Sequence, residues 1–254
     1  MQPGRLLVLG ICGAQGSGKS TLAGELARDL LAEGIATAQL SLDDLYLPRA
    51  ARLRLASEVH PLFATRGVPG THDVDLGLAV LDAIERGEAV PLPRFDKARD
   101  EPVPRAEWPR AAEQCRVLVL EGWCLGAWPQ AQADLRDPVN ELERVEDPQG
   151  LWRAYANAAL GGAYRALFDR VDRLALLAAP GFEVVAGWRG EQEQVLRGRP
   201  DAPAAMDEAA IARFIQHYER LTRHILREMP PRADLLVRLD KRRRPVEIVR
   251  RQQA

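Results

Sequence analysis

The first forty residues show a short apolar run, then an amphipathic stretch, then a second short apolar run. Residues Arg5–Cys12 are almost entirely apolar and end beside a glycine, which predicts a strand buried on both faces of a parallel sheet. Apolar residues recur at helical spacing from Lys19 to Glu33, and Gly34 is placed to end that helix. Residues Thr37–Leu42 predict a second strand, followed by two acids. The apolar face expected for the helix consists of Leu22, Ala23, Leu26, Ala27 and Leu30.

The same alternation continues along the chain, interrupted by two irregular segments. Leu45–Thr71 has poor periodicity and several prolines, so we expect mostly loop with one short helix. Pro91–Pro109 carries prolines among charged residues, which predicts an ordered surface loop. Further helices are expected over Asp73–Arg86, Leu151–Asp169, Phe182–Arg197 and Asp207–Glu228. Further strands are expected over Arg116–Glu121, Arg173–Leu177, Asp234–Leu239 and Val246–Arg250.

Strands that alternate with helices predict an α/β fold with three layers, in which a mostly parallel sheet lies between flanking helices. We expect a single domain over residues 1–254, because α/β folds commonly reach this length as one unit.

Composition and charge exclude several classes of protein. The 254 residues are 46% hydrophobic and 28% charged, which excludes a disordered, collagen-like or coiled-coil chain. The net charge of -1 argues against a nucleic-acid partner. No stretch approaches the ~20 apolar residues that span a bilayer, so no membrane partner is expected. The three cysteines form neither a metal-binding spacing nor an even disulfide set, which indicates a reducing, cytoplasmic location.

One motif carries a specific chemistry. Residues 13–20 read GAQGSGKS and match G-x-x-x-x-G-K-[ST] between a predicted strand and a predicted helix. Lys19 is expected to reach the β- and γ-phosphates of ATP, and the Ser20 hydroxyl to coordinate Mg²⁺. The residues expected to hold the nucleotide are Gly13, Ala14, Gln15, Gly16, Ser17, Gly18, Lys19, Ser20 and Thr21. The motif alone does not distinguish a kinase from an ATPase or a GTPase.

Three acids follow predicted strands: Asp43 and Asp44 after the second strand, and Glu121 at the end of the third. Ligands of an open parallel sheet bind beyond the carboxyl ends of its strands, so these acids should lie near the phosphate loop. We expect Asp43 to accept the proton of an attacking alcohol. Asp44 is explained equally well as a structural residue of the turn and as a residue that binds Mg²⁺ through water. Glu121 is expected to meet Mg²⁺ or its water shell, with an arginine salt bridge as the alternative.

Four further motifs follow the phosphate loop in order: Ser41–Tyr46 (SLDDLY), Thr65–Asp73 (TRGVPGTHD), Leu92–Lys97 (LPRFDK) and Leu120–Trp123 (LEGW). Together with the loop they resemble the D-glycerate 3-kinases of plants and their fungal and bacterial relatives. Those enzymes belong to the wider group of uridine kinase, phosphoribulokinase and pantothenate kinase. The resemblance runs from Gly13 to about Asp240 and implies a P-loop NTPase fold, ATP and Mg²⁺ as cofactors, and a small-molecule hydroxy acid as substrate.

The resemblance also implies roles for individual residues. Asp43 corresponds to the catalytic base. Trp188 and Arg189 correspond to a Trp-Arg pair in a lid region at about 182–200. Lys19 and Arg189 would both act on the transferring phosphate. The R-G-x-P-G-x-H-D motif carries over to Arg66, Gly67, Pro69, Gly70, His72 and Asp73 in a substrate-side segment at 45–109. The residues expected to bind substrate are Asp43, Tyr46, Arg66, His72, Asp73 and Arg94.

Several alternatives remain open from the residues alone. The acceptor is expected to be D-glycerate, and its carboxylate needs a cation, for which Arg66 is the first choice and Arg94 and Lys97 come next. Another small alcohol, such as a nucleoside or a pantothenate-like molecule, is the first alternative. A non-catalytic nucleotide-binding regulator is the second, and it would not need Asp43 as a base. His72 is explained as well by helix capping as by substrate binding, and part of the basic run Lys241–Arg244 is expected to border the nucleotide.

Overall fold

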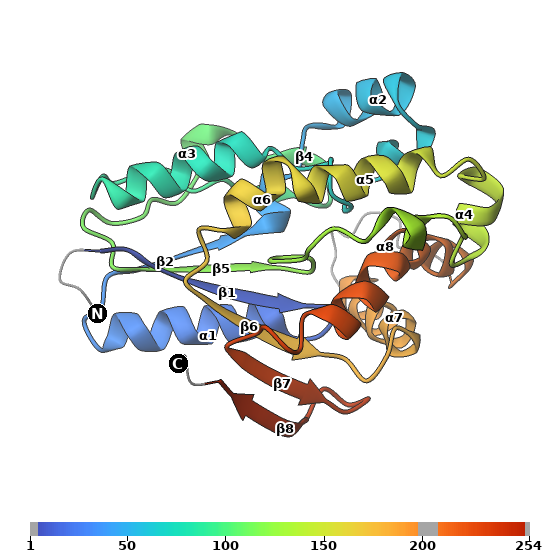
Figure 1. Cartoon of the computed structure of the whole chain (residues 1–254). Helices are drawn as coiled ribbons and strands as arrows, with labels where there is room; N and C mark the ends of the chain where they lie inside the picture. The colour runs from blue at the N-terminus through green and yellow to red at the C-terminus, as the bar shows by residue number, and fades with distance from the viewer. Residues whose placement is uncertain (1–4, 198–207, 252–254) are drawn as a thin grey trace.

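A central sheet organises the computed structural model, which describes residues 5–197 and 208–251 (Figure 1). In this part of the chain, six strands pair in the order β2-β5-β1-β6-β7-β8. The first five run parallel and β8 pairs antiparallel with β7. The strands are β1 (Leu7–Gly13), β2 (Thr37–Ser41), β5 (Val117–Gly122), β6 (Arg173–Ala178), β7 (Leu235–Leu239) and β8 (Pro245–Arg250). The predicted mostly parallel sheet is confirmed.

Helices cover both faces of this sheet. Figure 1 shows α1 against one face, and α3, α5 and α6 against the other, with α7 and α8 beside the carboxyl ends of the strands. The helices are α1 (Lys19–Ala32), α2 (Arg49–Glu58), α3 (Val74–Glu85), α4 (Glu141–Glu146), α5 (Leu151–Gly161), α6 (Ala163–Phe168), α7 (Glu183–Arg197) and α8 (Glu208–Glu228). Short 3₁₀ helices are η1 (Leu42–Leu45), η2 (Pro61–Ala64), η3 (Arg105–Glu107) and η4 (Gln132–Leu135), and β3 (Phe95–Asp96) pairs with β4 (Glu101–Pro102) in a small hairpin. The predicted three-layer class is confirmed.

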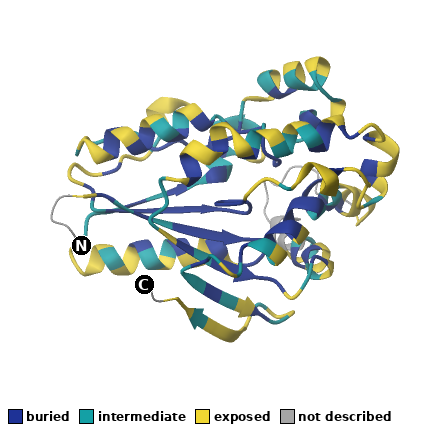
Figure 2. Ribbon diagram, viewed as in Figure 1, coloured by how far each residue is buried: buried dark blue, intermediate teal, exposed yellow. Residues whose placement is uncertain are grey.

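Burial explains the strand sequences. β5 is buried at every position and β1 is buried or half-buried along its length, whereas each helix has an exposed outer face (Figure 2). A strand buried on both faces needs apolar residues at every position, which is the pattern read in β1 and β5. Helix α1 buries Ala23 and Ala27 against the sheet, but Leu22 is 39% exposed. Leu26 and Leu30 are half-buried and also pack against this core, so only Leu22 departs from the expected apolar face.

Two other expectations need correction. The predicted helix Leu151–Asp169 is two helices, α5 and α6, because the chain leaves helical geometry at Gly162 (φ -102°, ψ -115°). Helix α4 was not predicted at all. The predicted strand Thr37–Leu42 ends at Ser41, and Leu42 opens η1. The irregular segments are confirmed: α2 is the one α-helix of Leu45–Thr71, and Pro91–Pro109 contains only β3, β4 and η3.

The register of the sheet brings the candidate residues to one edge. β1 pairs Cys12 with Gly122 of β5, and β2 pairs Ser41 with Glu121. The phosphate loop, Asp43 and Glu121 therefore follow three adjacent parallel strands at their carboxyl ends. Among the described residues, no helix is long and apolar enough to cross a membrane.

Candidate active site

The phosphate loop connects β1 to α1. Gly18 is the N-cap residue of α1, with φ 90°, and no side chain caps the helix. The first backbone N–H groups of the helix are therefore available to an anion, and the helix N-terminus attracts negative charge. Lys19 is 9% exposed and lies in the first turn of α1. This arrangement fits a phosphate chain held by backbone amides and one ammonium.

A hydroxyl and a carboxylate lie beside Lys19. The Ser20 hydroxyl donates to Glu121 Oε1 at 2.8 Å, which joins α1 to the end of β5. Glu121 is 3% exposed, and its Oε2 has no hydrogen-bond partner in the described part of the chain. A buried carboxylate oxygen without a partner is costly, so this atom is suited to a cation that arrives with the ligand.

The chemistry of this donor pair fits Mg²⁺. Magnesium takes oxygen ligands and is usually bound by one or two protein groups together with substrate phosphates. Within the described ranges no group of three or more His, Cys, Asp and Glu side chains is placed to hold a metal by itself. Ser20 and Glu121 thus match a metal that is shared with a nucleotide, and the predicted pair is brought together.

Asp43 lies in η1, directly beyond β2. The Ser41 hydroxyl accepts from the Asp43 backbone N–H at 3.2 Å and fixes the start of this turn. Tyr46 donates its hydroxyl to Asp43 Oδ1 at 2.8 Å, and Lys97 Nζ lies 2.5 Å from Oδ2. Burial alone would raise the pKa of Asp43, but the ammonium groups of Lys97 and Lys19 lower that pKa below its usual range. Asp43 is therefore ionised in the free protein.

Asp44 points to a structural role. Its Oδ1 accepts from the Phe95 backbone N–H at 3.2 Å, and its Oδ2 lies 3.4 Å from Arg94. Burial raises the pKa of Asp44, and Arg94 partly offsets that increase. Asp44 thus ties η1 to β3, which is the structural alternative considered from the sequence. Arg94, expected to bind substrate, is instead engaged by Asp44 and by the Gln39 carbonyl at 3.5 Å.

One cavity collects about half of the expected residues. Those predicted from the sequence that line it are Gln15, Gly16, Lys19, Ser20, Asp43, Tyr46, Arg66, Lys97 and Arg189. Three aromatic residues complete the wall and were not among the expected site residues: Trp123, Phe214 and Tyr218. Trp123 follows the acid of β5 by two positions, so the L-E-G-W motif could have indicated it. Phe214 and Tyr218 lie one helical turn apart on α8, a spacing that by itself indicates packing in the core.

Arg66 reaches the cavity from a turn that is fixed by aromatic residues. Tyr218 donates to the Arg66 carbonyl at 3.0 Å, and the Trp123 indole donates to the Gly67 carbonyl at 2.9 Å. Gly67 has φ 136°, and a Cβ there would overlap the Tyr218 hydroxyl. A glycine at position 67 is therefore required by this close approach. The Arg66 guanidinium pairs with Asp100 and lies 5.6 Å from the Phe95 ring centroid.

Two other expected substrate residues lie outside this cavity. Asp73 is the N-cap of α3 and accepts from the Leu76 backbone N–H at 2.9 Å. His72 lies behind Tyr46, with the two rings stacked at 4.6 Å, and bonds to the Tyr164 hydroxyl at 2.6 Å. Burial lowers the pKa of His72 to about 4, so the ring is neutral near pH 7. His72 supports the residue that contacts Asp43 and does not line the cavity itself, and Asp73 is the cap.

The expected lid region corresponds to α7, while its residues 198–200 lie outside the described residues. Trp188 is buried against Gly16, where a Cβ would approach the tryptophan Cβ to 2.7 Å. Arg189 follows it into the cavity and lies 5.5 Å from the Phe214 ring centroid. Arg243, from the basic run, donates to the Gly16 carbonyl at 2.6 Å. One residue of this run thus contacts the phosphate loop directly.

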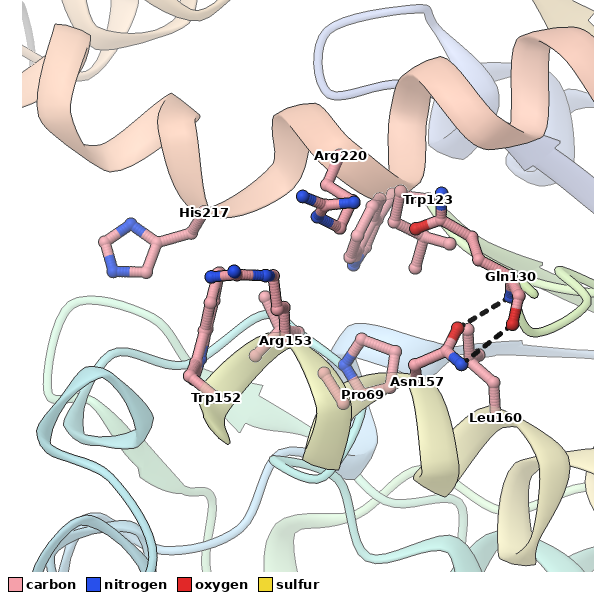
Figure 3. Close-up of a pocket in the computed structure, with 12 residues that line it drawn as sticks. Pro69, Trp123, Gln130, Trp152, Arg153, Asn157, Leu160, His217 and Arg220 are labelled. Atoms are coloured by element: carbon pink, nitrogen blue, oxygen red, sulfur yellow. Dashed lines mark hydrogen bonds between the residues drawn. The ribbon is translucent and has the colours of Figure 1, made fainter. Parts of the chain in front are cut away.

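A second cavity lies on the other side of Trp123, between α5 and α8 (Figure 3). In Figure 3 the Gln130 backbone and the Asn157 side chain exchange two hydrogen bonds at 2.6 and 3.1 Å. Arg153 and Arg220 also line this cavity, and both guanidinium groups are buried and bonded to the chain between β5 and α5. These contacts join α5 and α8 to the chain between β5 and α5.

Comparison with known proteins agrees with this geometry. No protein-family model matches the chain. It is 33% identical over 226 residues to an uncharacterised kinase of Schizosaccharomyces pombe, a match that covers 85% of this chain and 79% of that one. It is 27% identical over 258 residues to the chloroplastic D-glycerate 3-kinase of Arabidopsis thaliana, covering 94% of this chain and 54% of the plant enzyme. The solved structure of D-glycerate 3-kinase from Cryptococcus neoformans superposes with a TM-score of 0.80 and 25% identity over 97% of this chain and 90% of that one. The chain belongs to the D-glycerate 3-kinase-like family of P-loop small-molecule kinases.

Proposed function

We propose that this P-loop kinase transfers the γ-phosphoryl group of ATP to the terminal hydroxyl of D-glycerate and forms 3-phosphoglycerate. The observation that carries this proposal is the make-up of a single cavity. Lys19 and Ser20 of the phosphate loop, Asp43, and two cations, Arg66 and Lys97, all line it. The likeness to D-glycerate 3-kinases supports the choice of acceptor.

The acceptor side favours an anionic alcohol. A small acid beside ATP must be held against the negative charge of the phosphates, which requires a dedicated cation. A guanidinium binds a carboxylate through two parallel hydrogen bonds, and an ammonium adds a point charge. A nucleoside or a pantothenate-like alcohol needs no pair of cations at this position, so such a kinase is the weaker alternative. A non-catalytic regulator would not need an ionised Asp43 in the same cavity.

The proposed reaction assigns one task to each group. The terminal hydroxyl of glycerate gives its proton to Asp43 as its oxygen bonds to the γ-phosphorus. The bond between that phosphorus and the β–γ bridging oxygen breaks, and its electron pair stays on ADP. Lys19 and Arg189 stabilise the charge on the transferring group, and Ser20 and Glu121 would hold Mg²⁺. When bound, Mg²⁺ supplies further positive charge to the phosphate oxygens.

The test is phosphorylation by the purified protein, with ATP, Mg²⁺ and D-glycerate, followed by phosphorus NMR of the product. We expect one new phosphomonoester resonance that coincides with the resonance of added 3-phosphoglycerate. Lys19→Ala should lower the rate by about 10³-fold, as expected when a preorganised charge is removed from the transition state. Turnover of a neutral alcohol without turnover of D-glycerate would reject the acceptor and leave only the kinase activity. A Lys19→Ala rate within threefold of wild type would reject the assignment of the site.

A further inference from the structure

Lys97 occupies an unusual position for a residue on an exposed hairpin. Its side chain is 58% exposed, yet its Nζ lies 2.5 Å from Oδ2 of Asp43, whose side chain is 20% exposed. The two residues are 54 positions apart in the sequence and come from η1 and from the turn after β3. The hairpin therefore delivers an ammonium from the cavity mouth onto the expected base.

The backbone that carries Lys97 is held firmly. Asp100, on the same turn, accepts from Arg52 at 2.6 Å and also pairs with Arg66. Arg66 donates in addition to the Lys97 carbonyl at 3.2 Å. Arg52 is 1% exposed and is also bonded to the carbonyls of Leu47 and Ala64, so the turn that carries Lys97 is attached to a buried side chain. The flexible part is the Lys97 side chain, a four-carbon stem with its ammonium at the cavity mouth.

The contact has a chemical cost for catalysis. Oδ1 of Asp43 already accepts from Tyr46, and Oδ2 is the oxygen that an incoming hydroxyl must reach. The charged and titratable groups around this carboxylate are Lys97, Lys19, Tyr46, Arg66, Arg189 and Tyr218, with His72 behind Tyr46. Of these, Lys97 contacts Oδ2 itself. An ammonium on a carboxylate stabilises its ionised form and weakens it as a base.

We propose that Lys97 selects anionic acceptors by exchanging partners: its ammonium leaves Asp43 for the carboxylate of the incoming hydroxy acid, so that one event binds the acid and frees the base. This inference rests on the proposed function of the cavity and specifies how that cavity discriminates between acceptors. A neutral alcohol offers no anion to Lys97 and meets a base that is still engaged. Arg66 lines the same cavity as Lys97, so a second cation is available to the same small anion.

The test compares two acceptors that differ only in the group offered to Lys97. D-glycerate carries a carboxylate where glycerol carries a hydroxymethyl group. For Lys97→Met, kcat/KM with D-glycerate should fall roughly 30-fold or more, the loss expected for a charged hydrogen bond, while kcat/KM with glycerol should stay the same or rise. Arg99→Met, on the same hairpin with an 81% exposed side chain, removes the same charge and should keep the wild-type preference.

A second measurement reports on the base directly. With glycerol as acceptor, the acidic limb of the kcat/KM profile should move to higher pH in Lys97→Met, because Asp43 loses its neighbouring ammonium. Equal losses for both acceptors, or an acidic limb that does not move, would overturn the exchange. These results are distinct from failure of the proposed function, which would appear as no phosphorylation of D-glycerate by the wild-type protein.

Discussion

Two regions of this protein differ in how their buried polar groups are hydrogen-bonded. At the phosphate loop and the end of β5, the hydroxyl of Ser17 and Oε2 of Glu121 are buried without hydrogen-bond partners in the described part of the chain. Behind Trp123, Arg153 and Arg220 are equally buried, but each guanidinium makes four hydrogen bonds. We call these two residues the arginine anchors. The two arginines are hydrogen-bonded to the chain and stabilise the fold, whereas Oε2 of Glu121 is left without a partner and is suited to a ligand.

The arginine anchors explain why an irregular stretch of chain is well defined. Arg153 bonds to the carbonyls of Leu135 and Arg136 at 2.7 and 3.1 Å. Arg220 bonds to both oxygens of Glu143 at 2.8 and 2.6 Å, and Glu143 is fully buried. The anchors thus satisfy backbone carbonyls that a loop would otherwise leave to water. Their contacts fix η4 and α4 against α5 and α8.

Removing an arginine anchor should produce the largest effect on folding. Arg220→Met leaves Glu143 buried and unpaired, which is expected to lower the free energy of unfolding by about 3–5 kcal/mol. Urea denaturation followed by circular dichroism measures this loss. Arg213→Met is the matched control on the same helix, because its partner Glu146 is partly exposed, and it should change the free energy by less than about 1 kcal/mol. Equal losses for the two variants would remove the distinction between the regions.

Removing a charge from the catalytic cavity should act on activity instead. Asp43→Asn is expected to lower kcat by about 10²-fold or more, the range supplied by general-base catalysis, with ATP binding retained. Its free energy of unfolding should change by less than about 1 kcal/mol, because Lys97 is half exposed and the amide oxygen can still accept from Tyr46. Asp44→Asn should have the milder effect on kcat. A reversal of the two would move the base by one residue.

A buried histidine beside the arginine anchors makes a smaller contribution to stability, which depends on pH. Burial lowers the pKa of His217 from 6.5 to about 4. Between these two values the unfolded chain binds a proton that the folded protein does not bind. The free energy of unfolding is therefore highest above pH 6.5 and decreases as the pH falls toward 4. Between about pH 7 and about pH 5 this loss is about 2 kcal/mol for one such histidine.

His217→Gln should remove that part of the pH dependence, and urea denaturation at the two pH values measures it. His72, whose pKa is also lowered to about 4, retains its own contribution in this variant. A pH dependence of the same size in His217→Gln and wild type would contradict the burial of a neutral ring at this position.

Local sequence patterns predicted the sheet and the phosphate loop because both depend on neighbours in the chain. A doubly buried strand requires a continuous apolar run, and the loop requires its glycines and its lysine at fixed spacing. Helix α4 was missed although Asn140 caps its first turn, because its six residues are too few to show an apolar periodicity. The break between α5 and α6 had a signal in the Gly161–Gly162 pair, which the apolar spacing on both sides concealed.

The candidate site shows the same division between residues that local sequence predicts and contacts that only the folded chain makes. Lys19, Ser20 and Asp43 follow directly from strand ends and a motif. The contact of Lys97 with Asp43, the support of Tyr46 by His72, and the use of Arg94 by Asp44 all join segments that approach each other only in the folded protein. Residue type indicated that these side chains matter, but only the arrangement of η1 and the β3–β4 hairpin decides which of them reach the cavity.

The most direct test concerns the unpartnered oxygen of Glu121. Calorimetry would measure binding of a non-hydrolysable ATP analogue, with Mg²⁺ and with EDTA, to wild type and to Glu121→Gln. Wild type should bind at least about 10-fold more tightly with Mg²⁺, whereas Glu121→Gln should lose most of that difference without loss of stability. The same Mg²⁺ dependence in both proteins would contradict the account, because the open bond of Glu121 would then have no part in holding the ligand.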